Sequence, residues 1–155
     1  MLIKQQCALY EQAKKIYILG VRYERGNYWF PTYSHDEVVY MPVVYMPAIE
    51  AASPAPIPTY TVAELGIMLP EFVEKGDKQF RLIRWKNMPE NSESGKMVHR
   101  ICYEQEFTEG PERIPGWEHP IVRDWEAVAM ADLLILILEE KMVTVETIND
   151  SINNA

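Results

Sequence analysis

Basic side chains gather in one short segment of this chain. Residues 75–86 hold five basic side chains against the single acid Asp77, a local net charge of +4. The five are Lys75, Lys78, Arg81, Arg84 and Lys86. Two aromatic residues, Phe80 and Trp85, lie between them. Proteins hold phosphates and stack bases with cations and aromatic rings, so this composition indicates a contact with nucleic acid.

The same segment is also predicted to be a β-strand, and a strand divides these charges between two faces. Side chains alternate along a strand, which places Arg81 on one face with Ile83 and Trp85. Arg84 and Lys86 then fall on the other face. This division favours the charged ends of a half-buried strand over a continuous basic stripe. Nucleic-acid contact is therefore the alternative interpretation, through Lys78, Arg81, Arg84, Trp85 and Lys86.

The remaining reactive residue types do not predict an active site. His99 and Cys102 are three positions apart, which on a strand places a base and its nucleophile on opposite faces. His35 begins a His-Asp-Glu run, but no second cluster with metal-ligand spacing exists. Glu104 and Glu106 share one strand face, as solvent-facing acids commonly do. We expect no catalytic residue, no cofactor and no metal site, and a small enzyme is the least favoured interpretation.

Residues 31–60 read as an extended, proline-rich arm. The segment Val-Val-Tyr-Met-Pro at 38–42 is repeated at 43–47, and Pro54, Pro56 and Pro58 follow. Each proline removes an amide donor, so the arm is predicted to be an edge strand and extended chain, not a helix or a central strand. A duplication tolerated in a connector explains the repeat. The alternative is a partner-binding arm whose contact residues are Tyr40, Met41, Tyr45 and Met46.

A short helix at 61–69 has both of its ends marked. Thr61 can accept a hydrogen bond from the first free amides, and Glu64 can reach back to the Thr61 amide as a capping box. Tyr60 and Leu65 stand where a hydrophobic staple closes, and Pro70 cannot continue the helix. The strongest local motif in the chain therefore concerns folding.

Periodicity predicts the other elements. The expected order is a helix at 6–19 ended by Gly20, a hairpin of 21–24 with 28–30, antiparallel strands at 80–86 and 98–107, a loop at 109–120, a helix at 124–142 and a frayed tail at 149–155. The helix at 124–142 carries two apolar stripes, so it is either the central core helix or a helix that also meets another subunit. We predict one α+β domain spanning 1–155, with an antiparallel sheet packed against a long C-terminal helix and two shorter helices alongside.

Composition narrows the class of protein. The chain has 155 residues with 48% hydrophobic and 25% charged residues, which is typical of a globular domain. Its formal net charge is −8, and residues 110–155 account for −6 through nine acids and three basic residues. This charge disfavours a protein that contacts nucleic-acid phosphates over its whole surface, because such contacts need a surplus of Lys and Arg; it leaves room for a local basic patch. We expect no signal peptide and no membrane span, and we expect Cys7 and Cys102 to be reduced thiols of a cytoplasmic protein.

The order of segments resembles a family of small bacteriophage and prophage proteins of gut Bacteroidetes whose function is not established. The resemblance rests on the helix before Gly20, the aromatic and proline-rich segments, the capped helix, Ile83-Arg84-Trp85-Lys86, and the helix that contains 126–134. It carries no catalytic or binding residue. It implies a phage-related setting in the cytoplasm of a bacterial host.

The leading interpretation is a phage- or prophage-related accessory protein that acts as a non-catalytic interaction or structural module. We expect its partner to be a second copy, through the last helix or the arm at 31–60, or another phage or host protein. Nucleic acid is the less favoured partner, and no membrane is expected.

Overall fold

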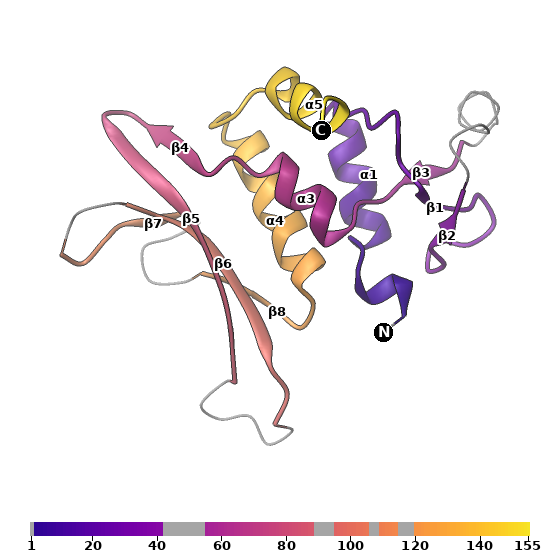
Figure 1. The fold of residues 1–155 in the computed structure, drawn as a ribbon, viewed down its shortest axis with the longest axis horizontal. Coiled ribbons are helices and arrows are strands. Elements are labelled where there is room, and N and C mark those ends of the chain that lie inside the picture. Colours follow the sequence, from indigo (N-terminus) through magenta and orange to yellow (C-terminus); the bar gives the residue numbers. More distant parts are fainter. Residues whose placement is uncertain (1, 42–54, 89–94, 106–108, 115–119) are drawn as a thin grey trace.

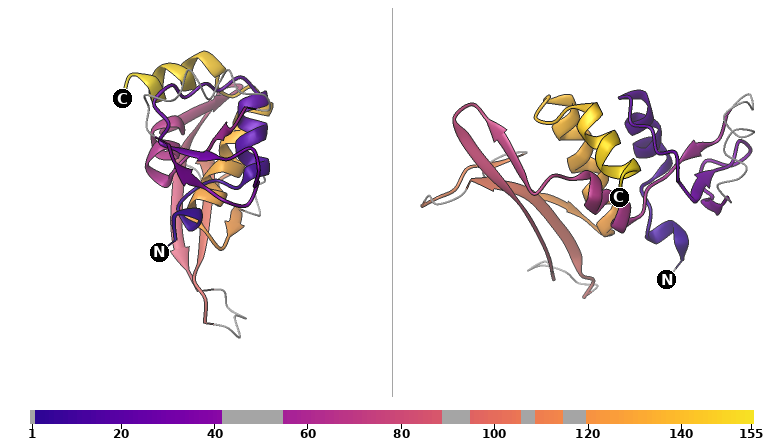
Figure 2. Two further views of the ribbon diagram at one scale, coloured as in Figure 1. Left: turned by 90° about the vertical axis from the view of Figure 1, so that its right-hand side faces the viewer. Right: turned by 45° about the horizontal axis from the view of Figure 1, so that its top comes forward.

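Helices and a large antiparallel sheet form two layers in the computed structural model of this chain (Figure 1). The structure describes residues 2–41, 55–88, 95–105, 109–114 and 120–155. The helix α4 (Glu126–Glu139) lies between the sheet on one side and the remaining helices on the other. A smaller sheet lies at the end of the molecule farthest from the large sheet (Figure 2). The prediction of a single α+β domain with an antiparallel sheet and a C-terminal core helix is confirmed.

The helix α4 is the centre of the core. It makes contacts with α1 (Tyr10–Ile18), α3 (Val62–Met68) and two strands of the large sheet, and ten of its residues are buried. Burial on several sides follows from its two apolar stripes. The prediction of a central core helix is therefore correct, and the chain itself covers most of both stripes. The helix ends before Lys141, whose backbone φ of 56° leaves the helical region.

The large sheet has the order β4-β5-β6-β7, and β8 also pairs with β6. Its strands are β4 (Phe72–Lys75), β5 (Lys78–Asn87), β6 (Val98–Gln105), β7 (Arg113–Ile114) and β8 (Ile121–Arg123). The antiparallel pairing of β5 with β6 is confirmed. The strand β4 was not predicted, and the expectation of a loop at 109–120 is wrong at Arg113–Ile114, which pairs with Tyr103 and Glu104.

The predicted hairpin of 21–24 with 28–30 does not form. The strand β1 (Tyr28–Phe30) pairs instead with β2 (Val39–Tyr40) and β3 (Ile57–Pro58), which come from the two ends of the predicted arm. Residues 21–24 run beside α5 (Val145–Asn153), where the amides of Arg22 and Glu24 donate to the side chains of Asn149 and Asn153. Those amides are satisfied without a strand partner. Both arm strands are edge strands, as the prolines predict.

The capping box of α3 is confirmed. The amide of Glu64 donates to Thr61 Oγ1 at 3.3 Å, and the amide of Thr61 donates to Glu64 Oε2 at 2.7 Å. Tyr60 and Leu65 are both fully buried in the main core. The first helix is shorter than the predicted 6–19, because Cys7 and Ala8 pair with the backbone of Thr61 and Tyr60 and α1 begins only at Tyr10. A separate 3-10 turn, Ile3–Gln5, precedes it.

The predicted frayed tail is wrong. The helix α5 (Val145–Asn153) covers the core with Ile148 and Ile152, which are 1% and 3% exposed. Thr144 caps it by accepting a hydrogen bond from the amide of Thr147. Two apolar residues four positions apart give this short helix one buried face. Among the described residues, no helix has the length and apolar character needed to cross a membrane.

Candidate functional site

An apolar groove of about 690 Å³ lies where α1, the small sheet and the start of α4 meet. Its apolar lining comes from segments that are far apart in the sequence: Ala8, Leu9, Tyr10, Phe30, Val38 and Trp125. Lys4, Glu11, His35 and Asp36 complete the lining. We call this site the apolar groove. Concave sites with mostly apolar walls and a few polar groups are typical of binding sites.

Packed aromatic rings hold the walls of the apolar groove in place. The ring of Tyr10 meets the edge of Phe30 with 5.4 Å between centroids, and it stacks on the imidazole of His35 at 4.0 Å. The neighbouring Trp29 is 2% exposed and donates from Nε1 to the carbonyl of Gly26 at 2.8 Å. These contacts join β1 and the following loop to α1. The groove is therefore formed before any partner arrives.

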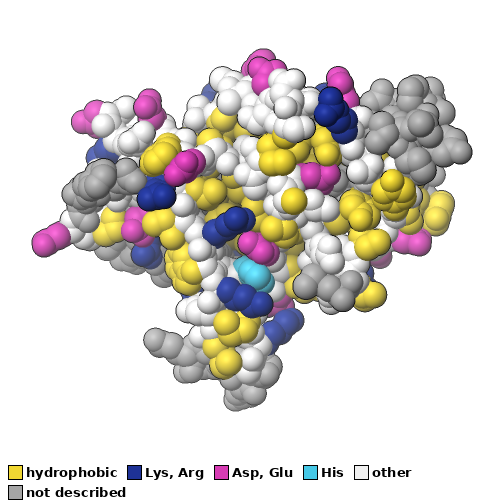
Figure 3. All heavy atoms as spheres, in the orientation of Figure 1, with side chains coloured by type: hydrophobic (Ala, Val, Ile, Leu, Met, Phe, Trp, Pro, Cys, Tyr) yellow, Lys and Arg dark blue, Asp and Glu magenta, His cyan; other side chains and the backbone are white. Residues whose placement is uncertain are grey.

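Exposed apolar side chains continue from the apolar groove over the adjoining surface. Leu9 lies in the groove and is 45% exposed, and Leu2 and Ile3 line a second hollow that shares Val38 and Asp36 with it. Leu2, Tyr33 and Tyr40 are 60%, 79% and 60% exposed. Hydrophobic side chains are also visible over the small sheet in Figure 3. Contiguous exposed apolar surface is characteristic of interaction sites.

The described part of the predicted interaction arm belongs to this surface. Tyr40 lies in β2, opposite Tyr28 of β1, and the two rings meet at 6.0 Å. The amide of Met41 donates to the carbonyl of Asn27 at 2.6 Å. Tyr45 and Met46 lie outside the described residues. The arm therefore begins as the edge of a sheet, and Tyr40 lies in the strand next to the apolar groove.

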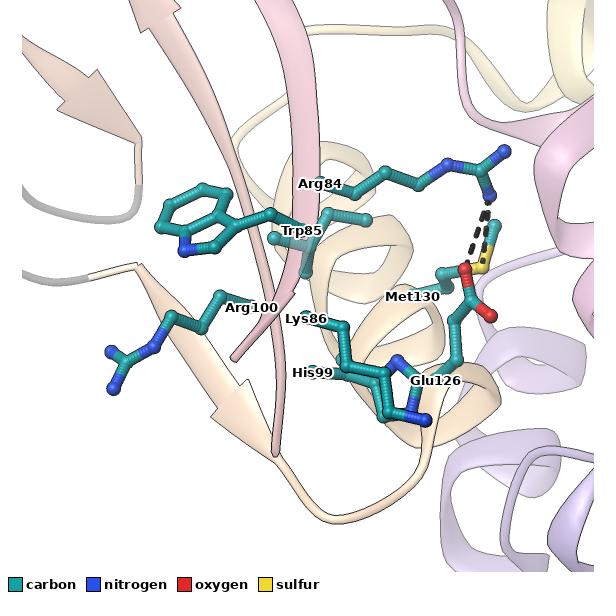
Figure 4. Close-up of a pocket in the computed structure, with 9 residues that line it drawn as sticks. Arg84, Trp85, Lys86, His99, Arg100, Glu126 and Met130 are labelled. Atoms are coloured by element: carbon teal, nitrogen blue, oxygen red, sulfur yellow. Dashed lines mark hydrogen bonds and ion pairs between the residues drawn. The ribbon is translucent and has the colours of Figure 1, made fainter. Parts of the chain in front are cut away.

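A second site, which we call the basic pocket, lies between the large sheet and the start of α4. It has a volume of about 290 Å³, and Arg84, Lys86, His99, Glu126 and Met130 line it. Lys86 and His99 are opposite one another in the β5–β6 register. Figure 4 shows these side chains on the side of the strands that faces α4, where Lys86 and His99 lie close together. Figure 3 shows a histidine with basic and acidic side chains beside it, open to solvent on this face of the molecule.

One weak ion pair partly neutralises the basic pocket. Arg84 Nη1 lies 3.5 Å from Glu126 Oε1 and 3.8 Å from the sulfur of Met130. Charge-assisted hydrogen bonds of good geometry are nearer 2.8 Å, so this contact is long. Within the described part of the chain, the side chains of Lys86 and His99 have no hydrogen bond or ion pair.

The structure separates the predicted nucleic-acid contacts. Lys78 bonds to Glu112 at 2.8 Å near the opposite end of β5, and this contact lowers the pKa of the Glu112 carboxyl. Arg81 lies 3.5 Å from Glu71 on the outer face of the sheet. The side chain of Trp85 also points away from α4 (Figure 4). The predicted split of the basic segment is confirmed, and only Arg84 and Lys86 come together.

Comparison of this chain with protein-family models, with curated proteins and with solved structures finds no significant match. The function is therefore inferred from the geometry of the two sites.

Neither cysteine has the surroundings of a nucleophile. Cys7 and Cys102 are fully buried. Burial, followed by the nearby charge of Glu64, raises the pKa of the Cys7 thiol to about 12. Burial likewise raises the pKa of Cys102 to about 11. A thiol reacts as its thiolate, so both side chains are inert near neutral pH.

The other candidates for chemistry are held in structural contacts. Glu104 accepts a hydrogen bond from Arg113 Nε at 2.8 Å, and Glu106 lies outside the described residues. His35 stacks on Tyr10 in the apolar groove. Across the described ranges, no group of three or more His, Cys, Asp or Glu residues is arranged to hold a metal ion.

Trp125 and His99 contribute to the two sites, and neither contribution was predicted from the sequence. Trp125 precedes α4 and is far from Leu9 in the sequence. No pattern in the sequence indicates that these two residues line the same groove. In the sequence, His99 was considered only as a base for Cys102. It lies close to Lys86 because the register of β5 and β6 pairs the two residues. The sequence predicts the two strands but does not establish their register.

Proposed function

We propose that this protein is a non-catalytic interaction module that binds an apolar segment of another protein in the apolar groove. The observation that carries this proposal is the apolar groove itself, in which Leu9 is 45% exposed, together with exposed rings nearby in the chain: Tyr33 in the β1–β2 loop at 79% and Tyr40 in β2 at 60%. Leaving such side chains in water is unfavourable, and a partner that covers them gains about 25 cal/mol for each Å² removed from solvent.

The edge of β2 supports an extended peptide as the occupant. Among the described strands, β2 pairs only with β1, so its other edge offers backbone groups beside the groove. An added strand satisfies such groups while its alternate side chains enter a neighbouring pocket. The mixed charges of Lys4, Glu11 and Asp36 provide contacts that fix the peptide's register.

The biological setting of the proposal comes from the sequence. We propose an accessory role in a bacteriophage or prophage, within the cytoplasm of the bacterial host, because the order of segments resembles such proteins. A second copy of this chain is the competing occupant of the apolar groove.

Selection from a random peptide display library on the immobilised protein tests the proposal. We expect apolar peptides whose binding falls by about tenfold or more in Leu9→Ser and Trp125→Ser, because both side chains line the groove and large apolar anchors dominate such contacts. Ile18→Ser is the matched control, because Ile18 is 71% exposed at the other end of α1. Equal binding to all variants would contradict the proposal. If sedimentation velocity shows a dimer that is lost in Trp125→Ser, the occupant of the groove is a second copy of this chain and not a peptide of another protein.

A further inference from the structure

The basic pocket combines three nitrogen donors that no described protein acceptor fully uses. Arg84 contributes a planar guanidinium, and its only described side-chain contacts are the long ones to Glu126 and Met130. Lys86 and His99 have no described side-chain partner. A lysine ammonium offers three donors, and an imidazole offers at least one in either tautomer. The site therefore offers several donors to an acceptor from outside the chain.

The local charge suits an anion although the whole chain is acidic. Around the basic pocket, on the face of the sheet toward α4, the cations are Arg84, Lys86 and Arg123, and the acids are Glu126 and Asp132. Arg123 is occupied by Asp132 at 2.7 Å. Arg100 also lines the pocket, but its side chain points away from α4 (Figure 4) and donates to Asn87 at 2.7 Å. The charges that remain on the α4 side of the pocket are Arg84, Lys86 and Glu126, which sum to +1 while the whole chain carries −8. An oxyanion that displaces Glu126 from Arg84 meets two cations and the imidazole.

The size and surroundings of the basic pocket favour a small ligand over a polynucleotide. Its volume of about 290 Å³ is at the lower end of the range for small-molecule sites. A nucleic-acid strand needs a groove of cations that spans several nucleotides, with aromatic rings on the same face. Trp85 belongs to the pocket lining, but its ring points to the opposite face of β5 (Figure 4). Strand alternation places the side chain of Arg81 on that opposite face as well.

We propose that the basic pocket binds the phosphate group of a small phosphomonoester. Arg84 holds two phosphate oxygens in the fork of its guanidinium, while Lys86 and His99 donate to the remaining oxygens. Glu126 is the internal competitor, because its carboxylate occupies Arg84 when no phosphate is bound. The site is separate from the apolar groove and does not depend on the function proposed for it.

Isothermal titration of the full chain with inorganic phosphate and with a nucleoside 5′-monophosphate tests the proposal at low salt. We expect Lys86→Gln and Arg84→Gln each to weaken binding by about tenfold or more, the usual effect of losing a charge-assisted hydrogen bond. Glu126→Gln should strengthen binding several-fold, because it removes the competitor. Arg81→Gln is the matched control, since it removes the same charge from the opposite face of the same strand, and we expect a change below about twofold.

Two results of the titration would overturn the phosphate site. One is the absence of binding at about 10 mM phosphate and nucleotide. The other is weaker binding in Glu126→Gln, because the carboxylate would then support the site. A third arm of the experiment titrates the protein with a single-stranded oligonucleotide. If the oligonucleotide binds more tightly than the mononucleotide, and if Arg81→Gln and Lys86→Gln weaken its binding equally, the ligand is a nucleic acid that contacts both faces of the sheet and not a small phosphomonoester. Thermal unfolding by circular dichroism confirms that each variant, all at exposed or half-exposed positions, is folded.

Discussion

Replacing Gln12 by Leu should destabilise this protein although the new side chain is apolar and similar in length. Gln12 is 8% exposed between α1 and α4. Its Nε2 donates to the carbonyl of Val128 at 2.9 Å and to Asp132 Oδ1 at 2.7 Å, while its Oε1 accepts from the amide of Leu9 at 3.0 Å. Leu9 is the N-cap of α1 and has no side-chain oxygen that could accept a hydrogen bond. Gln12 satisfies the backbone amide of Leu9 instead, at the end of the helix where backbone amides lack partners.

The expected loss follows from these three bonds. Two neutral hydrogen bonds contribute about 1 kcal/mol each, and the bond to the Asp132 carboxylate contributes about 2 kcal/mol. The apolar leucine recovers roughly 1–2 kcal/mol through burial. We therefore expect Gln12→Leu to lower the free energy of unfolding by about 2–3 kcal/mol.

Urea unfolding followed by circular dichroism measures this loss. Gln6→Leu is the control, because Gln6 is an exposed glutamine near the same helix, and its effect should stay below about 0.5 kcal/mol. A double-mutant cycle with Asp132→Ala should return a coupling energy of about 1 kcal/mol or more between the two side chains. A loss below about 0.5 kcal/mol in Gln12→Leu, or strict additivity in the cycle, would refute the view that this network joins α1 to α4.

Three further predictions concern the ends of the helices and the buried thiols. Thr61→Ala removes the cap of α3 and should cost about 1 kcal/mol in urea unfolding, with no change in the slope of the transition. Ile152→Ala should lower the free energy of unfolding by about 2–4 kcal/mol. It should also speed hydrogen exchange at the amides of Arg22 and Glu24, because both donate to asparagines of α5. Unchanged exchange would show that α5 does not anchor these two amides. The raised pKa values of Cys7 and Cys102 mean that folding favours the neutral thiols, so stability should be intact below the ordinary thiol pKa of 9.0 and fall as the pH rises toward about 11–12. The urea midpoint should fall less steeply over this range in Cys7→Ala than in the parent chain.

Local signals in the sequence predicted those elements whose decisive contacts are also local. The capping box of α3 uses residues three positions apart, and its two hydrogen bonds formed as expected. The division of Arg81 from Arg84 follows from strand alternation alone. The width of the apolar stripes on α4 predicted a helix that is buried on several sides, which the structure confirms.

Contacts between distant segments decided the elements that were missed. The strand β1 pairs with residues near 40 and near 57, and no local pattern in 28–30 selects these partners over 21–24. The helix α5 lies in a polar tail, and its asparagines bond to backbone groups about 130 positions earlier in the chain. Gln12 shows the same limit, since a glutamine in an amphipathic helix reads as a surface residue until its partners on α4 are known.

The two candidate sites are adjacent at the start of α4, but different side chains line each of them. Trp125 lines the apolar groove and Glu126, the next residue, lines the basic pocket. Trp125 is the N-cap, with extended backbone, and Glu126 is the first helical residue, so these two neighbours can line two different sites. The first turn of α4 is fixed by buried neighbours, including Ala127, Val128 and the Gln12 bond to the Val128 carbonyl. A phosphate that binds Arg84 therefore breaks its ion pair with Glu126, the neighbour of Trp125, while the backbone of this turn stays in place. The two sites can be occupied at once, and a substitution at Glu126 should change phosphate binding while peptide binding in the groove stays the same.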